Sequence, residues 1–133
     1  MDLGKSLSEI HVKDLMTKQL ISADPSTTLF QISKMMEQGV GAILVKKDSV
    51  PAGIITDRDF AIKIAANKVP LETTVDKVAS YPLKTIPADQ PVLKAAEMMS
   101  SLKIRKLAVS ENEKIVGIIT STDIVNLISA SKI

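Results

Sequence analysis

Two aspartates have neighbours of the kind that could bind a ligand. Asp59 and Asp123 each stand three residues after a threonine, Thr56 or Thr120, where an Ile-rich run ends. An aspartate held in the first turn of a helix can accept two hydrogen bonds, for example from the 2′- and 3′-hydroxyls of a ribose. The threonine adds a hydroxyl, and backbone N–H groups at a helix start can meet a phosphate. Either motif alone also has an ordinary structural explanation, because an aspartate in the first turn of a helix interacts favourably with the helix dipole.

The motif around these aspartates occurs twice. The segment Gly53-Ile54-Ile55-Thr56-Asp57-Arg58-Asp59 recurs as Gly117-Ile118-Ile119-Thr120-Ser121-Thr122-Asp123, an offset of 64 residues (117 − 53). Met35-Met36 recurs as Met98-Met99 at an offset of 63 (98 − 35), and the helical spacing of these residues predicts packing in a core or between the repeats. A period of this length indicates two copies of one structural unit. The predicted divisions are a lead segment (1–11), a first repeat (12–66), a linker (67–74) and a second repeat (75–130).

Hydrophobic spacing and turn residues predict the same order in both repeats, namely strand, helix, strand, strand, helix. The first helix is expected to be capped by Ser26 in one copy and Asp89 in the other, and the last helix to begin at Asp57 or Ser121. A unit of about sixty residues buries only about 60% of its unfolded surface. We therefore expect an α/β (α+β) fold in which the repeats pack sheet to sheet with pseudo-twofold symmetry. The predicted strands are 19–22, 41–45 and 52–56, then 83–86, 105–109 and 115–120.

The composition excludes several kinds of chemistry. The 133 residues include no Cys and one His (His11), which leaves no set of ligands for a zinc site and disfavours a catalytic triad. The 17 basic and 15 acidic residues are too balanced for a strong nucleic-acid footprint, and aromatic residues, at 2%, offer few surfaces for base stacking. No apolar run approaches the roughly 18 residues that a membrane span needs. We expect a cytoplasmic protein without a membrane partner.

The duplicated Gly-Ile-Ile-Thr-x-x-Asp motif, at the end of a strand and the start of a helix, resembles the tandem cystathionine-beta-synthase (CBS) domain pair. The segment Val12-Lys13-Asp14-Leu15-Met16-Thr17 is similar to the entry segment of that family, so the resemblance covers about residues 10–130. It implies a regulatory function rather than an enzyme, with no required cofactor. Such pairs bind AMP, ADP, ATP or S-adenosylmethionine between their repeats, pass the binding state to an effector protein and often form dimers.

The resemblance implies two clefts, each combining the ribose-binding Asp of one repeat with early strands of the other. Some family members place phosphate-binding basic residues at the positions of Arg105 and Lys106, so the cleft that contains them is expected to take a phosphorylated ligand. Ile21 and Ile86 are expected to flank the adenine in place of aromatic residues. Cleft A would comprise Ile21, Ser22, Ala23, Gly41, Ala42, Thr120, Thr122 and Asp123. Cleft B would comprise Thr56, Arg58, Asp59, Thr85, Ile86, Pro87, Arg105 and Lys106.

Three other functions stay open. The chain could be a homodimeric interaction or scaffold module with vestigial clefts, or it could bind nucleic acid through lysines such as Lys46 and Lys47. Catalysis by Asp57 and Asp59 is disfavoured, because residues two apart on a helix point in different directions. The two last helices carry more apolar residues than one core stripe needs, which indicates a homodimer formed through them. These residues are Ala61, Ile62, Ile64, Ala65, Ile124, Val125, Leu127 and Ile128.

Overall fold

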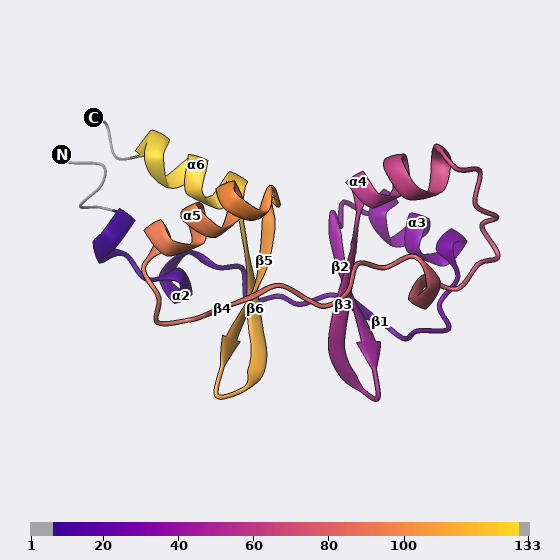
Figure 1. Ribbon diagram of the computed structural model, residues 1–133, viewed down its shortest axis with the longest axis horizontal. Coiled ribbons are helices and arrows are strands. Elements are labelled where there is room, and N and C mark those ends of the chain that lie inside the picture. The colour runs from indigo at the N-terminus through magenta and orange to yellow at the C-terminus, as the bar shows by residue number, and fades with distance from the viewer. Residues whose placement is uncertain (1–6, 131–133) are drawn as a thin grey trace. The chain divides into compact units, whose positions relative to one another are not determined.

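A computed structural model describes residues 7–130 and divides the chain into two compact units. The continuous unit is Leu20–Leu83, and the split unit combines residues up to Gln19 with those from Lys84 onward. In Figure 1 each unit is a three-stranded sheet with helices packed against it. The α/β class and the duplicated order of strand, helix, strand, strand, helix are confirmed. Residues 1–6 of the predicted lead segment lie outside the described residues.

The continuous unit has its strands in the order β1-β2-β3, with a parallel β1–β2 pair and an antiparallel β2–β3 hairpin. The helix after β3 begins as a short α-helix and widens into a π-helix. Alternation along β2 turns Ile43 and Val45 toward the helices, where they join Leu29 and Ile32 in one apolar core. The elements are β1 (Ser22–Ala23), α3 (Leu29–Glu37), β2 (Ala42–Lys47), β3 (Val50–Thr56), α4 (Asp57–Asp59), η1 (Phe60–Ala65) and the 3-10 turn η2 (Val75–Lys77).

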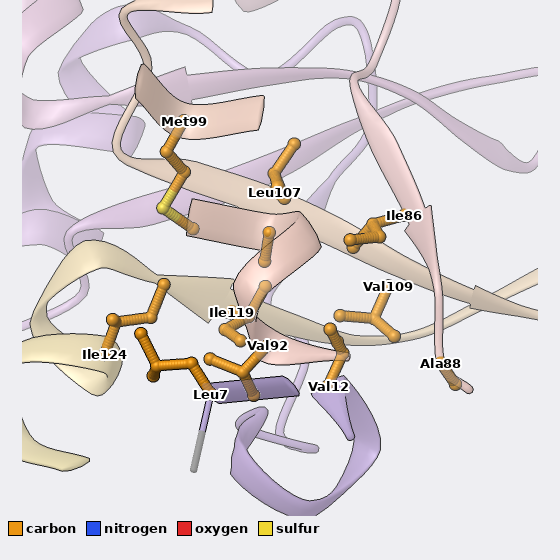
Figure 2. Close-up of a cluster of buried hydrophobic side chains, with 11 residues drawn as sticks. Leu7, Val12, Ile86, Ala88, Val92, Met99, Leu107, Val109, Ile119 and Ile124 are labelled. Atoms are coloured by element: carbon orange, nitrogen blue, oxygen red, sulfur yellow. The ribbon is translucent and has the colours of Figure 1, made fainter. Parts of the chain in front are cut away.

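The split unit has the matching order β4-β5-β6 with the same pairing directions. Figure 2 shows its core, in which Leu107 and Val109 of the sheet meet Val92 and Met99 of a helix. Val12, from the start of the first sequence repeat, belongs to this same core. The elements are α2 (Val12–Leu15), β4 (Thr85–Pro87), α5 (Val92–Leu102), β5 (Lys106–Glu111), β6 (Lys114–Thr120) and α6 (Ser121–Ala130).

A short segment at the start of each repeat lies on the sheet of the other repeat. Thr17 exchanges two backbone hydrogen bonds with Ile118, of 2.8 and 2.9 Å, so the start of the first repeat extends the sheet of the second. Ser80 exchanges two with Ile54, of 2.8 and 3.1 Å, and extends the sheet of the first. The compact units in space therefore differ from the repeats along the chain, because the connecting segments are exchanged between them.

The glycine of each Gly-Ile-Ile-Thr motif makes room for this exchanged segment. A Cβ at Gly53 would lie 2.6 Å from the ring of Tyr81 and 2.8 Å from the carbonyl oxygen of Ser80. A Cβ at Gly117 would lie 2.6 Å from the sulfur of Met16 and 2.9 Å from the carbonyl oxygen of Thr17. Only glycine permits backbones to approach this closely without displacement. The first residue of the motif thus has a structural function that its sequence context does not reveal.

The predicted N-caps of the first helix in each repeat are wrong by two residues. Helix α3 is capped by Thr28, whose hydroxyl accepts the Gln31 N–H at 3.2 Å while the Gln31 side chain accepts the Thr28 N–H at 3.0 Å. Ser26 has an apolar residue three positions later and lacks such a reciprocal partner. Helix α5 begins after Pro91 rather than at Asp89. Proline suits this position because its fixed φ fits the approach to a helix and its missing N–H needs no acceptor there.

The hairpins are tighter than the sequence indicates. Strand β2 continues through Lys47 and β5 through Glu111, which leaves only Asp48-Ser49 and Asn112-Glu113 as turns. All four turn residues have positive φ, between 52° and 65°. Two consecutive residues of this conformation match the right-handed twist of the flanking strands. No helix in the described part of the chain is long and apolar enough to cross a membrane.

Each sheet also has apolar residues on the face turned away from its own helices. Leu44 alternates with the core residues of β2, and Ala108 alternates with those of β5. A sheet that is apolar on both faces needs cover on both faces. This pattern agrees with the predicted sheet-to-sheet packing of the repeats, which stays a prediction.

Candidate ligand-binding site

The first candidate side chains meet where β3 ends and α4 begins. The Asp59 Oδ2 atom accepts hydrogen bonds from the Thr56 N–H at 2.8 Å and from the Thr56 hydroxyl at 3.1 Å. The Asp59 N–H in turn donates to Thr56 Oγ1 at 3.2 Å, which completes a capping box. The Asp59 side chain is 16% exposed. Its carboxylate is therefore held in one orientation and is still reachable from solvent.

The second copy of the motif has almost the same geometry. The Asp123 Oδ2 atom accepts the Thr120 N–H at 2.8 Å, and the Asp123 N–H donates to Thr120 Oγ1 at 3.2 Å. The helix that follows, α6, is regular throughout its length. Within residues 7–130, the Oδ1 atom of Asp123 has no hydrogen-bond or ion-pair partner. This oxygen is available to a donor from a ligand.

Lys63 distinguishes the first motif from the second. Its Nζ lies 3.6 Å from Asp59 Oδ1 and donates to the Ser80 hydroxyl at 2.7 Å. The residue at the corresponding position after Asp123 is Leu127, which carries no charge. Lys63 was not predicted from the sequence, although its spacing of four residues from Asp59 is the spacing at which helical side chains pair.

The threonine hydroxyls take part in the capping boxes. The Thr56 hydroxyl donates to Asp59 and accepts from it, and the Thr120 hydroxyl accepts the Asp123 N–H. Each threonine therefore fixes the orientation of its aspartate, and its own contact with a ligand stays a prediction. Arg58 and Thr122, the neighbours of these aspartates, are exposed.

The early residues of β2 and β5 lie beside the aspartate turn of their own unit. The Asp57 N–H donates to the Gly41 carbonyl at 3.2 Å, and Ala42 stands opposite Thr56 in the ladder. In the split unit the corresponding bond is from the Ser121 N–H to the Arg105 carbonyl, at 2.8 Å, and Lys106 stands opposite Thr120. The same place in the fold is neutral in one unit and doubly basic in the other. Clefts A and B each combine residues of both units, and they stay predictions.

The residues from the first strand of each repeat divide between core and surface. Ile86 is fully buried in the core of the split unit, beside Leu107 and Val109 in Figure 2, and Ala23 is buried in the core of the continuous unit. Their backbone groups can reach a ligand without disrupting a core, and the adenine contact expected of Ile86 stays a prediction. Strand alternation instead exposes Ser22, Thr85 and Pro87, while Ile21 is half-buried against the core.

A shallow groove lies at the other end of the sheet of the split unit. It is found near the β5–β6 hairpin, whereas Asp123 follows the far end of β6. Pro87 is the one candidate ligand-binding residue among those that line it. The lining residues are Lys13, Pro87, Ala88, Asp89, Ser110, Glu111 and Asn112.

Comparisons with known sequences identify the repeats. Residues 12–66 and 70–130 each match the family model described as CBS domain. The CBS domain-containing protein YhcV of Bacillus subtilis is 33% identical over 114 residues, which is 85% of this chain and 81% of that protein. The uncharacterized protein MK0525 of Methanopyrus kandleri is 33% identical over 125 residues, or 91% of this chain. The chain spans only 64% of the length of MK0525.

Solved structures show the same architecture. An uncharacterized conserved protein from Pyrococcus horikoshii is 29% identical with a TM-score of 0.84, over 100% of this chain and 96% of that one. The CBS domain pair of protein MJ0100, 27% identical with a TM-score of 0.81, matches over 92% of this chain and 98% of its own. It was solved in complex with 5′-methylthioadenosine and S-adenosyl-L-methionine. The chain thus belongs to the CBS-domain family and carries two copies of the domain in tandem.

Proposed function

We propose that the chain is a regulatory module that binds an adenosine-containing ligand, namely AMP, ADP, ATP or S-adenosylmethionine, between its two repeats. CBS domain pairs are regulatory modules, and the pair of MJ0100 binds two adenosine compounds. The observation that carries the proposal is the duplicated capping box, which holds a half-buried carboxylate at the start of each final helix. In this proposal Asp59 and Asp123 each receive the hydroxyls of one ribose.

The chemistry of each carboxylate supports this assignment. In both aspartates Oδ2 accepts a hydrogen bond from the threonine N–H. The Oδ1 atom of Asp59 faces Lys63, and the Oδ1 atom of Asp123 has no partner among the described residues. Each carboxylate oxygen can accept about two hydrogen bonds, so a ribose diol can be bound while the capping box stays intact. Charge-assisted hydrogen bonds of this kind are worth about 1.5–3 kcal/mol each when they are buried.

The proposed clefts differ in charge. Arg105 and Lys106, which would meet the ligand held by Asp59, are basic, whereas Gly41 and Ala42, which would meet the ligand held by Asp123, are neutral. A guanidinium group presents several N–H donors to a phosphate in a fixed geometry. We therefore assign a phosphorylated ligand to cleft B and a less charged ligand, such as S-adenosylmethionine, to cleft A.

Titration calorimetry on single variants tests the proposal. We expect Asp59→Asn and Asp123→Asn each to weaken binding of its own ligand by tenfold or more, while the other binding event is retained. Asp48→Asn is the matched control, because Asp48 lies in an exposed hairpin turn and asparagine tolerates its positive φ. Absence of heat with AMP, ADP, ATP and S-adenosylmethionine would overturn the proposal and favour a scaffold with vestigial clefts.

We also propose that the chain acts as a homodimer and signals to a separate effector protein. Of the apolar residues on the final helices, Ile64 and Ile124 are buried in the two cores. Ile62 and Val125, in contrast, are 52% and 60% exposed. Exposed β-branched residues on both final helices suit a contact with a second copy. Light scattering of the wild type and of Ile62→Glu/Val125→Glu tests this, since we expect a dimer that the variant converts to a monomer.

A further inference from the structure

Lys63 lies between the candidate ribose-binding carboxylate and the segment that leads to the second repeat. Its Nζ donates to the Ser80 hydroxyl at 2.7 Å and to the Val78 carbonyl at 3.4 Å, and it stands 3.6 Å from Asp59 Oδ1. Lys63 belongs to η1, whereas Val78 and Ser80 belong to the chain after η2. One ammonium group therefore contacts the candidate site and a segment fifteen or more residues away.

The contacted segment is the place where the chain leaves the continuous unit. Ser80 bridges Ile54 of β3, the Leu83 N–H donates to the Ala52 carbonyl at 2.9 Å, and the split unit resumes at Lys84. These few backbone hydrogen bonds fix residues 80–83 to the sheet. A side chain that strengthens or releases this segment acts on the connection between the two units.

From these contacts we propose that Lys63 is a positioning residue that couples occupancy of Asp59 to the connector 78–83. The inference rests on the proposed function, because it takes Asp59 as the acceptor of ribose hydroxyls. A ligand can shift a segment only through contacts that differ between the free and bound states. Hydroxyls that donate to Asp59 compete with Lys63 for the same carboxylate. The ammonium group then shifts its hydrogen bonding toward Ser80 and Val78, and the connector is held more firmly.

The second repeat lacks this coupling within the described residues. Leu127 replaces the lysine, and the exchanged segment on that sheet, Met16-Thr17, is held by the Thr17–Ile118 bridge and by packing against Gly117. No side chain of α6 bonds to it among residues 7–130. The proposed coupling therefore differs between the repeats, since it links the ligand on Asp59, but not the ligand on Asp123, to a connecting segment.

Hydrogen exchange on a double-mutant cycle tests the coupling without any ligand. In Lys63→Met the amides of Ser80 and Leu83 should exchange roughly fivefold faster, because the contact with Ser80 is lost. In Asp59→Asn they should exchange more slowly than in the wild type, because the ammonium group is released toward Ser80 and Val78. The double variant should exchange as fast as Lys63→Met alone, because Asp59 acts on the connector through Lys63. Lys34→Met is the matched control, since Lys34 pairs with Glu37 at 3.1 Å on the exposed face of α3 in the same unit. Additive effects, or unchanged exchange in both single variants, would overturn the coupling.

A second arm uses AMP and S-adenosylmethionine as probes. Whichever of them binds in an Asp59-dependent manner should slow exchange over residues 78–83 in the wild type but not in Lys63→Met, although the variant still binds it. Equal slowing in both proteins would overturn the coupling. If neither these probes nor ADP and ATP bind, the proposed function fails, and the ligand-free cycle still decides whether Lys63 links Asp59 to the connector.

Discussion

The turns at Asp59 and Asp123 share a capping box but differ in what surrounds it. In both, a threonine and an aspartate three residues apart bond reciprocally to each other's backbone. After Asp59 the chain forms a π-helix with Lys63 facing the carboxylate, and after Asp123 it forms a regular α-helix. The comparison shows that duplication preserved the local geometry that orients the carboxylate, whereas the charge near it diverged.

A second difference lies at the strand position beside each turn. Gly41 and Ala42 in the continuous unit correspond to Arg105 and Lys106 in the split unit. The strand pairing is the same, so the main chain does not distinguish the two places. The side chains alone give the two places a different charge, and this is where variants can separate the repeats.

The largest expected effect comes from filling the space at the motif glycines. Gly53→Ala should lower the free energy of unfolding by about 2–3 kcal/mol, because its Cβ would meet both the Tyr81 ring and a backbone oxygen. Gly117→Ala should cost less, about 1–2 kcal/mol, since the flexible Met16 side chain can move and leaves the Thr17 carbonyl oxygen, at 2.9 Å, as the remaining close contact. Urea denaturation measures both, and Met16→Ala should partly rescue Gly117→Ala. Equal losses at the two glycines would contradict this difference.

The next effect separates the repeats by ligand charge. Arg105→Ala should weaken AMP binding about tenfold, equivalent to about 1.4 kcal/mol, and leave 5′-methylthioadenosine unaffected because that compound has no phosphate. Calorimetry measures both affinities, with Lys114→Ala, an exposed hairpin lysine, as the control for net charge. A loss of equal size for both compounds would show that Arg105 acts on the fold rather than on a phosphate.

Removal of the capping hydroxyls should produce a smaller loss of stability. We expect Thr56→Val to lower the free energy of unfolding by about 1 kcal/mol and Thr120→Val by somewhat less, because the Thr56 hydroxyl both accepts from and donates to Asp59. Thr122→Val, an exposed change of the same shape in a first turn, is the control. Thermal and urea unfolding measure the difference. A greater loss of stability in Thr120→Val than in Thr56→Val would contradict this expectation.

The smallest effect concerns pH and the exchanged segment of the continuous unit. Burial, and then the negative charge of Asp76, raise the pKa of Tyr81 above its ordinary value of 10.0. The unfolded chain therefore loses this proton first, so the free energy of unfolding should fall as the pH rises from about 10 through the raised pKa. In the split unit Met16 and Thr17 occupy the corresponding place and do not titrate. Tyr81→Phe should remove this part of the alkaline loss, and a stability curve identical to the wild type would contradict it.

Some features were predicted wrongly from the sequence because they depend on a choice between neighbouring residues. The N-cap of α3 depends on whether Thr28 or Ser26 finds a reciprocal side chain three residues later, and Gln31 decides this. The exchange of connecting segments has a different cause. Val12 and Thr17 stand at the start of the first repeat in the chain but contact the second, and no local pattern indicates which sheet such a segment will join.

The amino-acid sequence by itself determined the duplication, the order of elements, the family and the two Thr–Asp turns, because hydrophobic period, turn residues and capping boxes act over a few neighbouring residues. Only the tertiary structure decided what lies against those turns. Lys63 reaches Ser80, Tyr81 covers Gly53 and Ile86 turns into a core through contacts between segments distant in the chain. Such contacts depend on how sheets and helices are assembled, so packing determined them and local propensity did not.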